Sequence, residues 1–159
     1  MTVEAVNDIP AGAEDDNITT TEDTPVTINL VSDDTDIDGD TLSVTVKKAA
    51  NNGRAVVDSD GITITYTPND HYHGLDSFEY TISDGNETVS GTINLTISPI
   101  NDVPVAGDDD ITTTEDTAVT ITPTVNDTDA DGDTLSVTAV TEPSNGSAVL
   151  NVDDDTVTY

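Results

Sequence analysis

Two segments of this 159-residue chain carry the same alternating carboxylates around a glycine. Residues 34–40 read Asp-Thr-Asp-Ile-Asp-Gly-Asp, and residues 127–133 read Asp-Thr-Asp-Ala-Asp-Gly-Asp. Calcium is a hard cation that takes about six to eight oxygen ligands, and alternate aspartates before a sharp glycine turn bring several carboxylates around one point. Both segments are therefore predicted to bind Ca²⁺, and their candidate ligands are Asp34, Asp36, Asp38, Asp40, Asp127, Asp129, Asp131 and Asp133.

The pattern also matches the opening of an EF-hand loop, which is an alternative reading. An EF-hand requires a bidentate glutamate at position twelve, where this chain has Thr45 in the first copy and Thr138 in the second. Predicted strands, not helices, flank both segments. The remaining ligands are therefore expected to come from elsewhere in the fold. A solvated acidic turn is the other alternative, and the repetition of the motif with its flanks and spacing argues against it.

The elements around these loops are predicted to be strands, because apolar residues fall at every second position. In the first copy the inward-facing series is Val26, Ile28, Leu30, Leu42, Val44, Val46, Ile62, Ile64, Tyr66, Phe78, Tyr80, Ile82, Ile93, Leu95 and Ile97. Two shorter edge strands are expected over residues 18–21 and 54–57. No helix is expected. About seven strands predict an all-β, Greek-key sandwich of immunoglobulin type.

The flanking sequence repeats as well, so the chain is interpreted as a tandem array. Thr20-Thr21-Glu22-Asp23-Thr24 returns at residues 113–117, and Asn7-Asp8-Ile9-Pro10 returns in the form Asn101-Asp102-Val103-Pro104. A complete repeat is predicted over residues 7–100 and an incomplete one over residues 101–159. Residues 1–6 align with residues 95–100, and they are interpreted as a remnant of the last strand of a preceding repeat.

The second repeat follows the first only part of the way. Its inward series is Val119, Ile121, Leu135, Val137, Ala139, Val157 and Tyr159, the last matching Tyr66. Residues 67–98 have no counterpart, so the second repeat is predicted to lack its last two strands. We expect it to be poorly ordered, or to be completed by strands that another chain adds to its open edge.

Charge narrows the range of partners. The chain has 33 acidic residues against three basic ones and a formal charge of −30, which repels nucleic acid and anionic membrane surfaces. No apolar run reaches the roughly 18 residues that a membrane span needs. The expected partner is a cation, and folding is expected to depend on calcium. Cysteine is absent, so we expect bound calcium to brace an extracellular module in place of disulfides.

These residues resemble the cadherin-like tandem repeats of bacteria and archaea, which occur in very large surface adhesins and in some secreted polysaccharide-degrading enzymes. The resemblance covers the whole chain. The motifs that carry it are Asn101-Asp102-Val103-Pro104, residues 113–117, the loop at residues 127–133, Tyr66-Thr67-Pro68, Asp76-Ser77-Phe78 and Ser83-Asp84-Gly85. The resemblance implies a calcium-braced sandwich whose linker to the neighbouring repeat shares calcium with the aspartate loop.

The resemblance also implies a set of ligands beyond the loops. In cadherins the linker D-x-N-D-N-x-P shares calcium with a D-x-D loop and with an aspartate at the end of a late strand. By that resemblance Asn7, Asp8 and Asp84 join Asp36 and Asp38 in the first repeat. In the second repeat, Asn101 and Asp102 join Asp129 and Asp131, with no counterpart of Asp84.

This chain departs from the cadherin pattern in three places. Pro99 stands for the first aspartate of the linker, Val103 stands for its last asparagine, and no L-D-R-E segment is present. One calcium ion per repeat is therefore predicted, in place of a three-ion junction. Glu22 and Glu115 are further candidate ligands, because a cadherin glutamate near the first strand reaches the linker side.

Two other kinds of chemistry have candidate residues in this chain. His71 and His73 could place two imidazoles on one face of an extended segment, as a zinc or copper site would need, but the chain has no third histidine. A polar loop before Gly74 is the alternative. Glycosidase chemistry needs a pair of carboxylates in a cleft with one raised pKa, and five aromatic residues spread along the chain do not build one. No enzymatic activity is expected.

The sequence leaves two candidate functions. The first is a structural and adhesive spacer of a large extracellular surface protein, in which calcium stiffens the sandwich and the linker between neighbouring repeats of the chain. The second is a calcium-dependent binding module. It would either recognise polysaccharide beside the catalytic domain of a secreted enzyme or bind a partner repeat through calcium, so its partner would be a surface glycan or another protein. Sugar platforms favour exposed aromatic side chains, and only Tyr72 is expected to be free for that role.

Overall fold

The computed structural model describes residues 6–13, 16–32 and 34–159. The chain divides into two compact units, Met1–Ile100 and Asn101–Tyr159. The strand remnant predicted for residues 1–6 lies outside the described residues except for Val6. No helix in the described part of the chain is long and apolar enough to cross a membrane.

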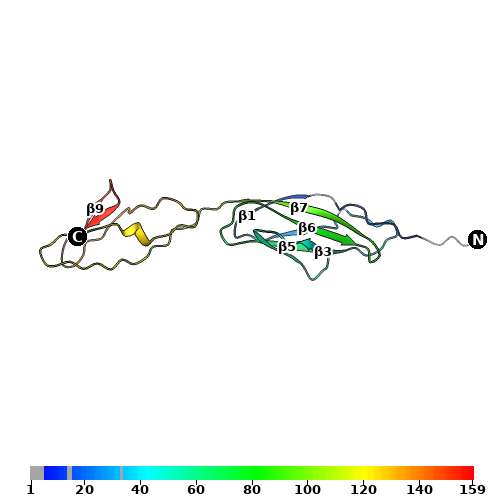
Figure 1. Ribbon diagram of the computed structural model, residues 1–159, viewed down its shortest axis with the longest axis horizontal. Coiled ribbons are helices and arrows are strands. Elements are labelled where there is room, and N and C mark those ends of the chain that lie inside the picture. The colour runs from blue at the N-terminus through cyan, green and yellow to red at the C-terminus, as the bar shows by residue number, and fades with distance from the viewer. Residues whose placement is uncertain (1–5, 14–15, 33) are drawn as a thin grey trace, which may run out of the picture. The chain divides into compact units, whose positions relative to one another are not determined.

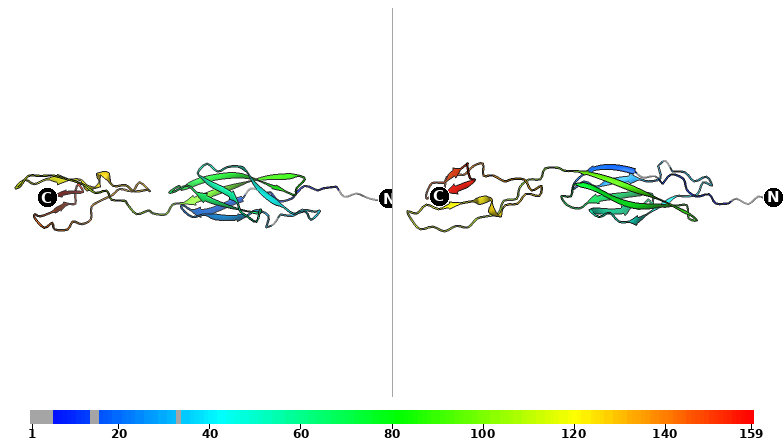
Figure 2. Two further views of the ribbon diagram at one scale, coloured as in Figure 1. Left: turned by 90° about the horizontal axis from the view of Figure 1, so that it is seen from below. Right: turned by 45° about the horizontal axis from the view of Figure 1, so that its top comes forward.

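The first unit is a sandwich of two β-sheets (Figures 1 and 2). One sheet has four strands in the order β1-β7-β6-β3, and the other has three strands in the order β2-β5-β4. The strands are β1 (Asp16–Thr21), β2 (Val26–Asn29), β3 (Ser43–Lys48), β4 (Gly53–Val57), β5 (Thr63–Pro68), β6 (Gly74–Ser83) and β7 (Thr88–Ser98). The seven-stranded all-β sandwich predicted from the sequence is confirmed, and the two short strands lie at sheet edges as expected.

Alternating side chains produce this sandwich by filling its interior from both sheets. Eleven apolar residues are buried in one cluster: Ile28, Leu30, Val44, Ile64, Tyr66, Phe78, Tyr80, Ile82, Ile93, Leu95 and Ile97. All of them belong to the predicted inward series, and three other members, Val26, Leu42 and Val46, are half-buried against the cluster. The rings of Tyr66 and Phe78 stack with their centroids 6.3 Å apart. Each large apolar side chain buried in this way contributes about 1.5–3 kcal/mol.

The two longest strands position both ends of the unit. β6 and β7 pair in antiparallel fashion from Gly74↔Ile97 to Ser83↔Thr88. β1 adds to the free side of β7 as a parallel strand, from Asp16↔Ile93 to Thr21↔Ser98. The residue after β1 and the residues after β7 therefore lie at one end of the unit, and the residue after β6 lies at the other end.

Gly53 allows the close approach of β4 to the core. A Cβ atom at this position would lie 2.4 Å from Tyr66 Oη and 2.6 Å from the carbonyl oxygen of Thr67. We expect Gly53→Ala to lower the free energy of unfolding by about 2 kcal/mol, because neither the buried ring nor the strand backbone can move away freely. Urea denaturation measures the change, and Ser59→Ala in an exposed turn is the control. Equal stability of the two variants would contradict the prediction.

The second unit contains a smaller sheet with the order β8-β10-β9. Its elements are β8 (Thr120–Ile121), the 3₁₀ turn η1 (Pro123–Asn126), β9 (Val149–Asn151) and β10 (Thr156–Thr158). Shifted by 93 residues, this is the β2-β5-β4 sheet of the first unit. The register is the same, since Ile121↔Val157 and Leu150↔Val157 correspond to Ile28↔Ile64 and Val57↔Ile64.

The strand expected around residues 135–139 does not form, and this corrects the sequence prediction. Its counterpart β3 is paired with β6 in the first unit, and residues 101–159 contain no counterpart of β6. Among those residues, all of which the structure describes, none is buried. Tyr159 is 39 % exposed, whereas its counterpart Tyr66 is fully buried. The alternation of apolar residues makes a strand only where another strand is present to pair with it.

Candidate metal centre

The aspartate loop of the first unit is closed by hydrogen bonds to one carboxylate. Asp36 Oδ1 accepts the backbone N–H groups of Asp38 (2.9 Å) and Asp40 (3.1 Å). Gly39, at φ +81°, donates its N–H to the carbonyl oxygen of Asp36, and a left-handed conformation of this kind favours glycine. The loop therefore turns sharply at Gly39, and the other oxygen of Asp36 is left for a different partner.

That other oxygen is the clearest sign of a binding site. Asp36 Oδ2 is buried and has no hydrogen-bond partner among the described residues. A buried carboxylate oxygen that no donor satisfies is costly. A cation beside it would remove that cost, so this oxygen fits a hard metal ion.

The linker at the start of the unit lies against the loop. The backbone N–H of Asp8 donates to Asp38 Oδ2 at 2.8 Å, and a pair of hydrogen bonds between Ala11 and Thr35 fixes the segments further along. Gly12 allows Asp34 to pack close, because a Cβ at Gly12 would lie 1.9 Å from Asp34 Oδ1. The linker and the loop therefore form one surface.

Asp84 reaches the same surface from the end of β6. Its Oδ2 accepts the side-chain amide of Asn7 at 2.9 Å, and its Oδ1 accepts the backbone N–H groups of Asn86 and Glu87, both at 2.7 Å. Asn86 Nδ2 donates to Asn7 Oδ1 at 2.8 Å. The Asn7 amide holds the pKa of the Asp84 carboxyl below its usual range, and the two backbone donors act in the same direction.

The structure thus brings together residues from three separate segments: Asn7, Asp8, Asp34, Asp36, Asp38 and Asp84. Asp40 takes part through its backbone N–H, and its side chain is exposed. Asn86 was not predicted as a site residue, although its position two residues after Asp84 is typical of a turn closed by an aspartate side chain. Asn7 faces Asp84 with its amide donors, and a carboxylate only accepts, so in this arrangement Asn7 orients Asp84.

The orientation of Asp84 gives a prediction about acid stability in the absence of metal. Because its folded-state pKa is lowered, the Asp84 bonds stabilise the fold above the unfolded pKa of about 3.9, and this contribution is lost as pH falls through the folded pKa. Asn7→Ala removes the main cause of the lowered pKa, so its acid-unfolding midpoint in EDTA should move to higher pH. Asn17→Ala, at an exposed position of β1, is the control, and equal midpoints would refute the assignment.

The second unit repeats the loop and its linker. Asp129 Oδ1 accepts the N–H groups of Asp131 (3.0 Å) and Asp133 (3.1 Å), and Gly132 has φ +77°. The N–H of Asp102 donates to Asp131 Oδ2 at 2.6 Å. These bonds correspond one for one to those of the first loop. The same sequence therefore produces the same local structure in a unit that lacks most of the sandwich.

The remaining candidates of the second unit lie around this loop or apart from it. Asp127 accepts the N–H of Gly107 at 2.8 Å, and Asn101 Nδ2 donates to the carbonyl oxygen of Asp102 at 2.6 Å. Glu115 is exposed. Its counterpart Glu22 is buried beside the segment that follows β7, and residues 101–159 contain no such segment.

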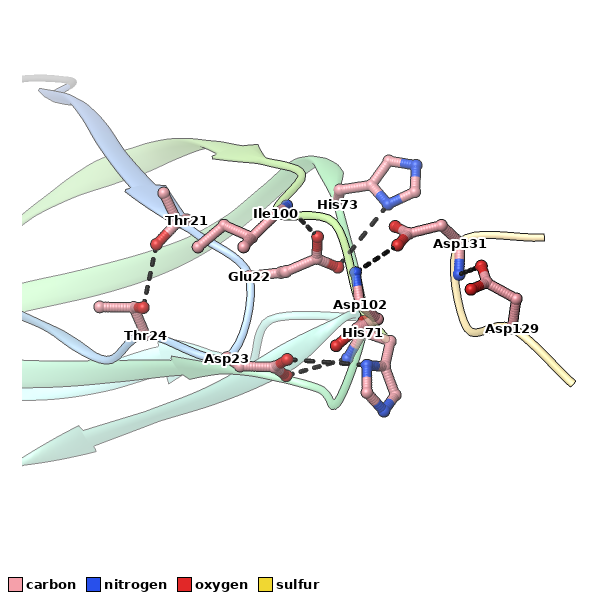
Figure 3. A network of polar contacts seen from close by, with 10 residues as sticks. All are labelled: Thr21, Glu22, Asp23, Thr24, His71, His73, Ile100, Asp102, Asp129 and Asp131. Carbon is pink, nitrogen blue, oxygen red and sulfur yellow. Dashed lines mark hydrogen bonds and ion pairs between the residues drawn. The ribbon is translucent and has the colours of Figure 1, made fainter. Parts of the chain in front are cut away.

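Glu22 lies at the opposite end of the first unit from the Asp36 loop, and Figure 3 shows it beside Ile100 and His73. It is 2 % exposed, and its Oε1 accepts the backbone N–H of Ile100. Its Oε2 has no hydrogen-bond partner among the described residues and lies 3.8 Å from His73 Nδ1. Glu22 therefore lies beside the linker that follows its own repeat, and its role as a metal ligand stays a prediction.

The two histidines do not form a common site. His71 Nδ1 lies 3.6 Å from Asp23 Oδ2, and the His71 N–H donates to Asp23 Oδ1 at 3.0 Å. His73 lies beside Glu22 instead (Figure 3). Each imidazole contacts a different carboxylate, as expected for the polar loop considered above.

Comparisons with known proteins agree with this architecture. A model of the bacterial Ig domain family matches residues 7–96 and again residues 101–159. No curated protein sequence matches the chain.

Solved structures provide a second comparison. A variant of the endo-fucoidan hydrolase MfFcnA4 from glycoside hydrolase family 107 is similar with a TM-score of 0.50 and 18 % identity, over 94 % of this chain and 24 % of the hydrolase. MfFcnA4 itself gives a TM-score of 0.49 and 19 % identity over the same shares. Titin domain M7 gives a TM-score of 0.31 and 16 % identity, over 60 % of this chain and 99 % of M7. This chain spans about a quarter of the length of the hydrolase, and the likeness shows a shared fold alone.

Proposed function

The chain belongs to the bacterial Ig domain family, and from that premise we propose that it is a calcium-binding structural repeat of a large extracellular surface protein. The observation that carries this proposal is the buried Asp36 Oδ2, which has no hydrogen-bond partner among the described residues. Its loop is hydrogen-bonded to the linker at Asp8, and the linker is hydrogen-bonded to Asp84 through Asn7. Asp36, Asp38 and Asp84 would hold the ion in the first unit with Asp8 from the linker. Asp102, Asp129 and Asp131 would hold it in the second.

The charge of the chain supports this proposal. A formal charge of −30 makes the compact state repel itself, and bound cations relieve that repulsion. Calcium accepts about six to eight oxygen ligands in flexible geometry, at roughly 2.3–2.6 Å, and Asp36 and Asp38 supply carboxylate oxygens from one turn. Extracellular modules bind calcium at about 10⁻⁴–10⁻³ M, a range that suits a partly exposed site of this kind.

The placement of these ligands implies that bound calcium would stiffen the link between the linker and its repeat. Ligands come from the linker (Asp8), the loop (Asp36, Asp38) and the end of β6 (Asp84), so one ion would tie the linker to the body of its repeat. Repeat proteins of this kind work through interfaces between neighbours. We propose a spacer with no catalytic role, whose partners are calcium and the neighbouring repeats.

Thermal unfolding tests the proposal. We expect the melting temperature of the chain to rise when EDTA is replaced by millimolar calcium, and magnesium at the same concentration to have a much smaller effect. At calcium one hundred times the dissociation constant the stabilisation is about 2.7 kcal/mol, which corresponds to roughly 10–20 °C for a domain of about 100 residues. Equal melting temperatures in EDTA and in calcium would overturn the proposal.

A binding module appended to a secreted polysaccharide-degrading enzyme is the second candidate. It is favoured by the fold that this chain shares with part of an endo-fucoidan hydrolase. Tyr72, which was expected to be free to stack on a sugar, is half-buried against the core, and its hydroxyl donates to the carbonyl oxygen of Leu75 at 2.7 Å. Binding to a glycan array that disappears in Tyr72→Ala, with unchanged thermal stability, would favour this candidate over the spacer.

A further inference from the structure

The backbone on either side of the boundary between the units is bound by carboxylates. Ile100, the last residue of the first unit, donates its N–H to Glu22 of that same unit. Asp102, the second residue of the second unit, donates its N–H to Asp131 of its own unit at 2.6 Å. Each bond lies within one unit and joins two protein groups directly.

Both bonds are of a strong kind. Hydrogen bonds from a backbone N–H to a carboxylate are shorter and roughly twice as strong as those between neutral groups. Glu22 is 2 % exposed, and burial strengthens the bond further because water cannot compete for the donor. The bond of Asp102 to Asp131 is part-buried.

The bond between Asp102 and Asp131 has a counterpart at the start of the first unit. There the N–H of Asp8 donates to Asp38 Oδ2 at 2.8 Å, and Asp8 and Asp38 occupy the positions that Asp102 and Asp131 occupy in the second unit. Asn7 adds a bond to Asp84 at 2.9 Å. In both copies the linker is therefore fastened to the repeat that follows it.

We propose that Glu22 and Asp131 are positioning residues that confine the joint between repeats to Ile100 and Asn101 in the metal-free protein. Each residue has two soft backbone torsions, so about four torsions remain free between the two bound N–H groups. A joint this short loses little conformational entropy when it is fixed. This inference rests on the proposed function, because such a short joint would let calcium stiffen the chain at little entropic cost.

Hydrogen exchange at single amides tests the inference. The probe is the ¹⁵N-labelled full chain in EDTA, and exchange at Ile100 and Asp102 is compared with exchange in an unstructured peptide of the same sequence. We expect about ten-fold or greater protection at both amides, as a charge-assisted bond provides. Exchange of both amides at the peptide rate would overturn the proposal.

Variants assign the protection to each carboxylate. Asp131→Ala should remove the protection of Asp102 and leave that of Ile100, and Glu22→Ala should do the reverse. Asp131→Asn and Glu22→Gln each keep an acceptor oxygen and should retain most of the protection. The amide of Leu95 in β7 reports whether the first unit stays folded, and if Glu22→Ala unfolds it, the result with Asp131→Ala decides. Protection of Asp102 that survives in Asp131→Ala would overturn the proposal.

A calcium titration of the same samples separates this inference from the proposed function. If the chain binds no calcium and still protects both amides in EDTA, the proposed spacer function is wrong and the confined joint stands. If the chain binds calcium and neither amide is protected in EDTA, the proposed spacer function stands and the confined joint is wrong.

Discussion

Asp76→Ala is expected to destabilise the first unit by about 3–5 kcal/mol. Asp76 is 8 % exposed, and its two oxygens accept four hydrogen bonds. The donors are the backbone N–H groups of Asn51 (3.1 Å), Asn52 (2.9 Å) and Ser77 (2.9 Å) and the hydroxyl of Tyr66 (2.8 Å). Alanine leaves these part-buried donors without an acceptor, and each unsatisfied donor costs about 1–3 kcal/mol where water cannot replace the carboxylate.

Two variants of the same network calibrate this expectation, and urea denaturation in EDTA measures all three. Tyr66→Phe removes a single hydroxyl and should cost about 1 kcal/mol. Asp76→Asn keeps one acceptor oxygen and should fall between the other two. A loss in Asp76→Ala no larger than that in Tyr66→Phe would show that Asp76 does not organise the loop between β3 and β4.

The double substitution Asp36→Asn and Asp38→Asn is expected to remove most of the calcium-dependent rise in the melting temperature of the first unit. Asp36 supplies the buried oxygen that has no hydrogen-bond partner in the described part of the chain. Neutral amides replace two negative ligands, which lowers affinity for a hard cation. Since a ligand stabilises only through binding to the native state, a shift of roughly 10–20 °C should shrink to a few degrees. In EDTA the double variant should melt close to the unmodified chain.

A matched control separates loss of ligands from loss of charge. Asp109→Asn and Asp110→Asn change the net charge by the same amount at exposed positions outside the loops. That control should keep the full calcium shift. If both double variants lose it equally, calcium acts through general neutralisation of an acidic chain, and the loop site is wrong.

The sequence predicted the sandwich well because the strand signal is local. Every apolar residue of the buried core belongs to the period-two series, and Gly39 and Gly132 turn the two loops as their positions predicted. The Asp36 loop, Asp8 and Asp84 were also expected near one another, by resemblance. Periodicity alone gave no reason to join Asp84 to residues 7–8, because pairing across the sandwich has no local signature.

The details that were missed all depend on contacts distant in sequence. Glu22 was predicted as a ligand on the linker side, and the parallel pairing of β1 with β7 places it beside Ile100, at the end of the unit opposite the Asp36 loop. Asn7 was expected as a ligand, and the acceptor-only carboxylate of Asp84 turns its amide donors inward. Tyr66 and Asp76 were each noted within a sequence motif, but the buried hydrogen bond between them was not predicted. Burial and donor direction decide these cases, and neither can be read from spacing.

The repeated three-stranded sheet has a consequence for how such a chain folds as it is synthesised. The strands of the β2-β5-β4 sheet lie close to one another in the sequence. β1, in contrast, can pair only after β7 has been synthesised, almost a full repeat later. Contacts between distant segments form slowly, and a ribosome extends the chain at only about 5–20 residues per second. A nascent repeat should therefore spend seconds as a small open sheet with one apolar face, and the density of acidic residues would then keep neighbouring nascent chains apart.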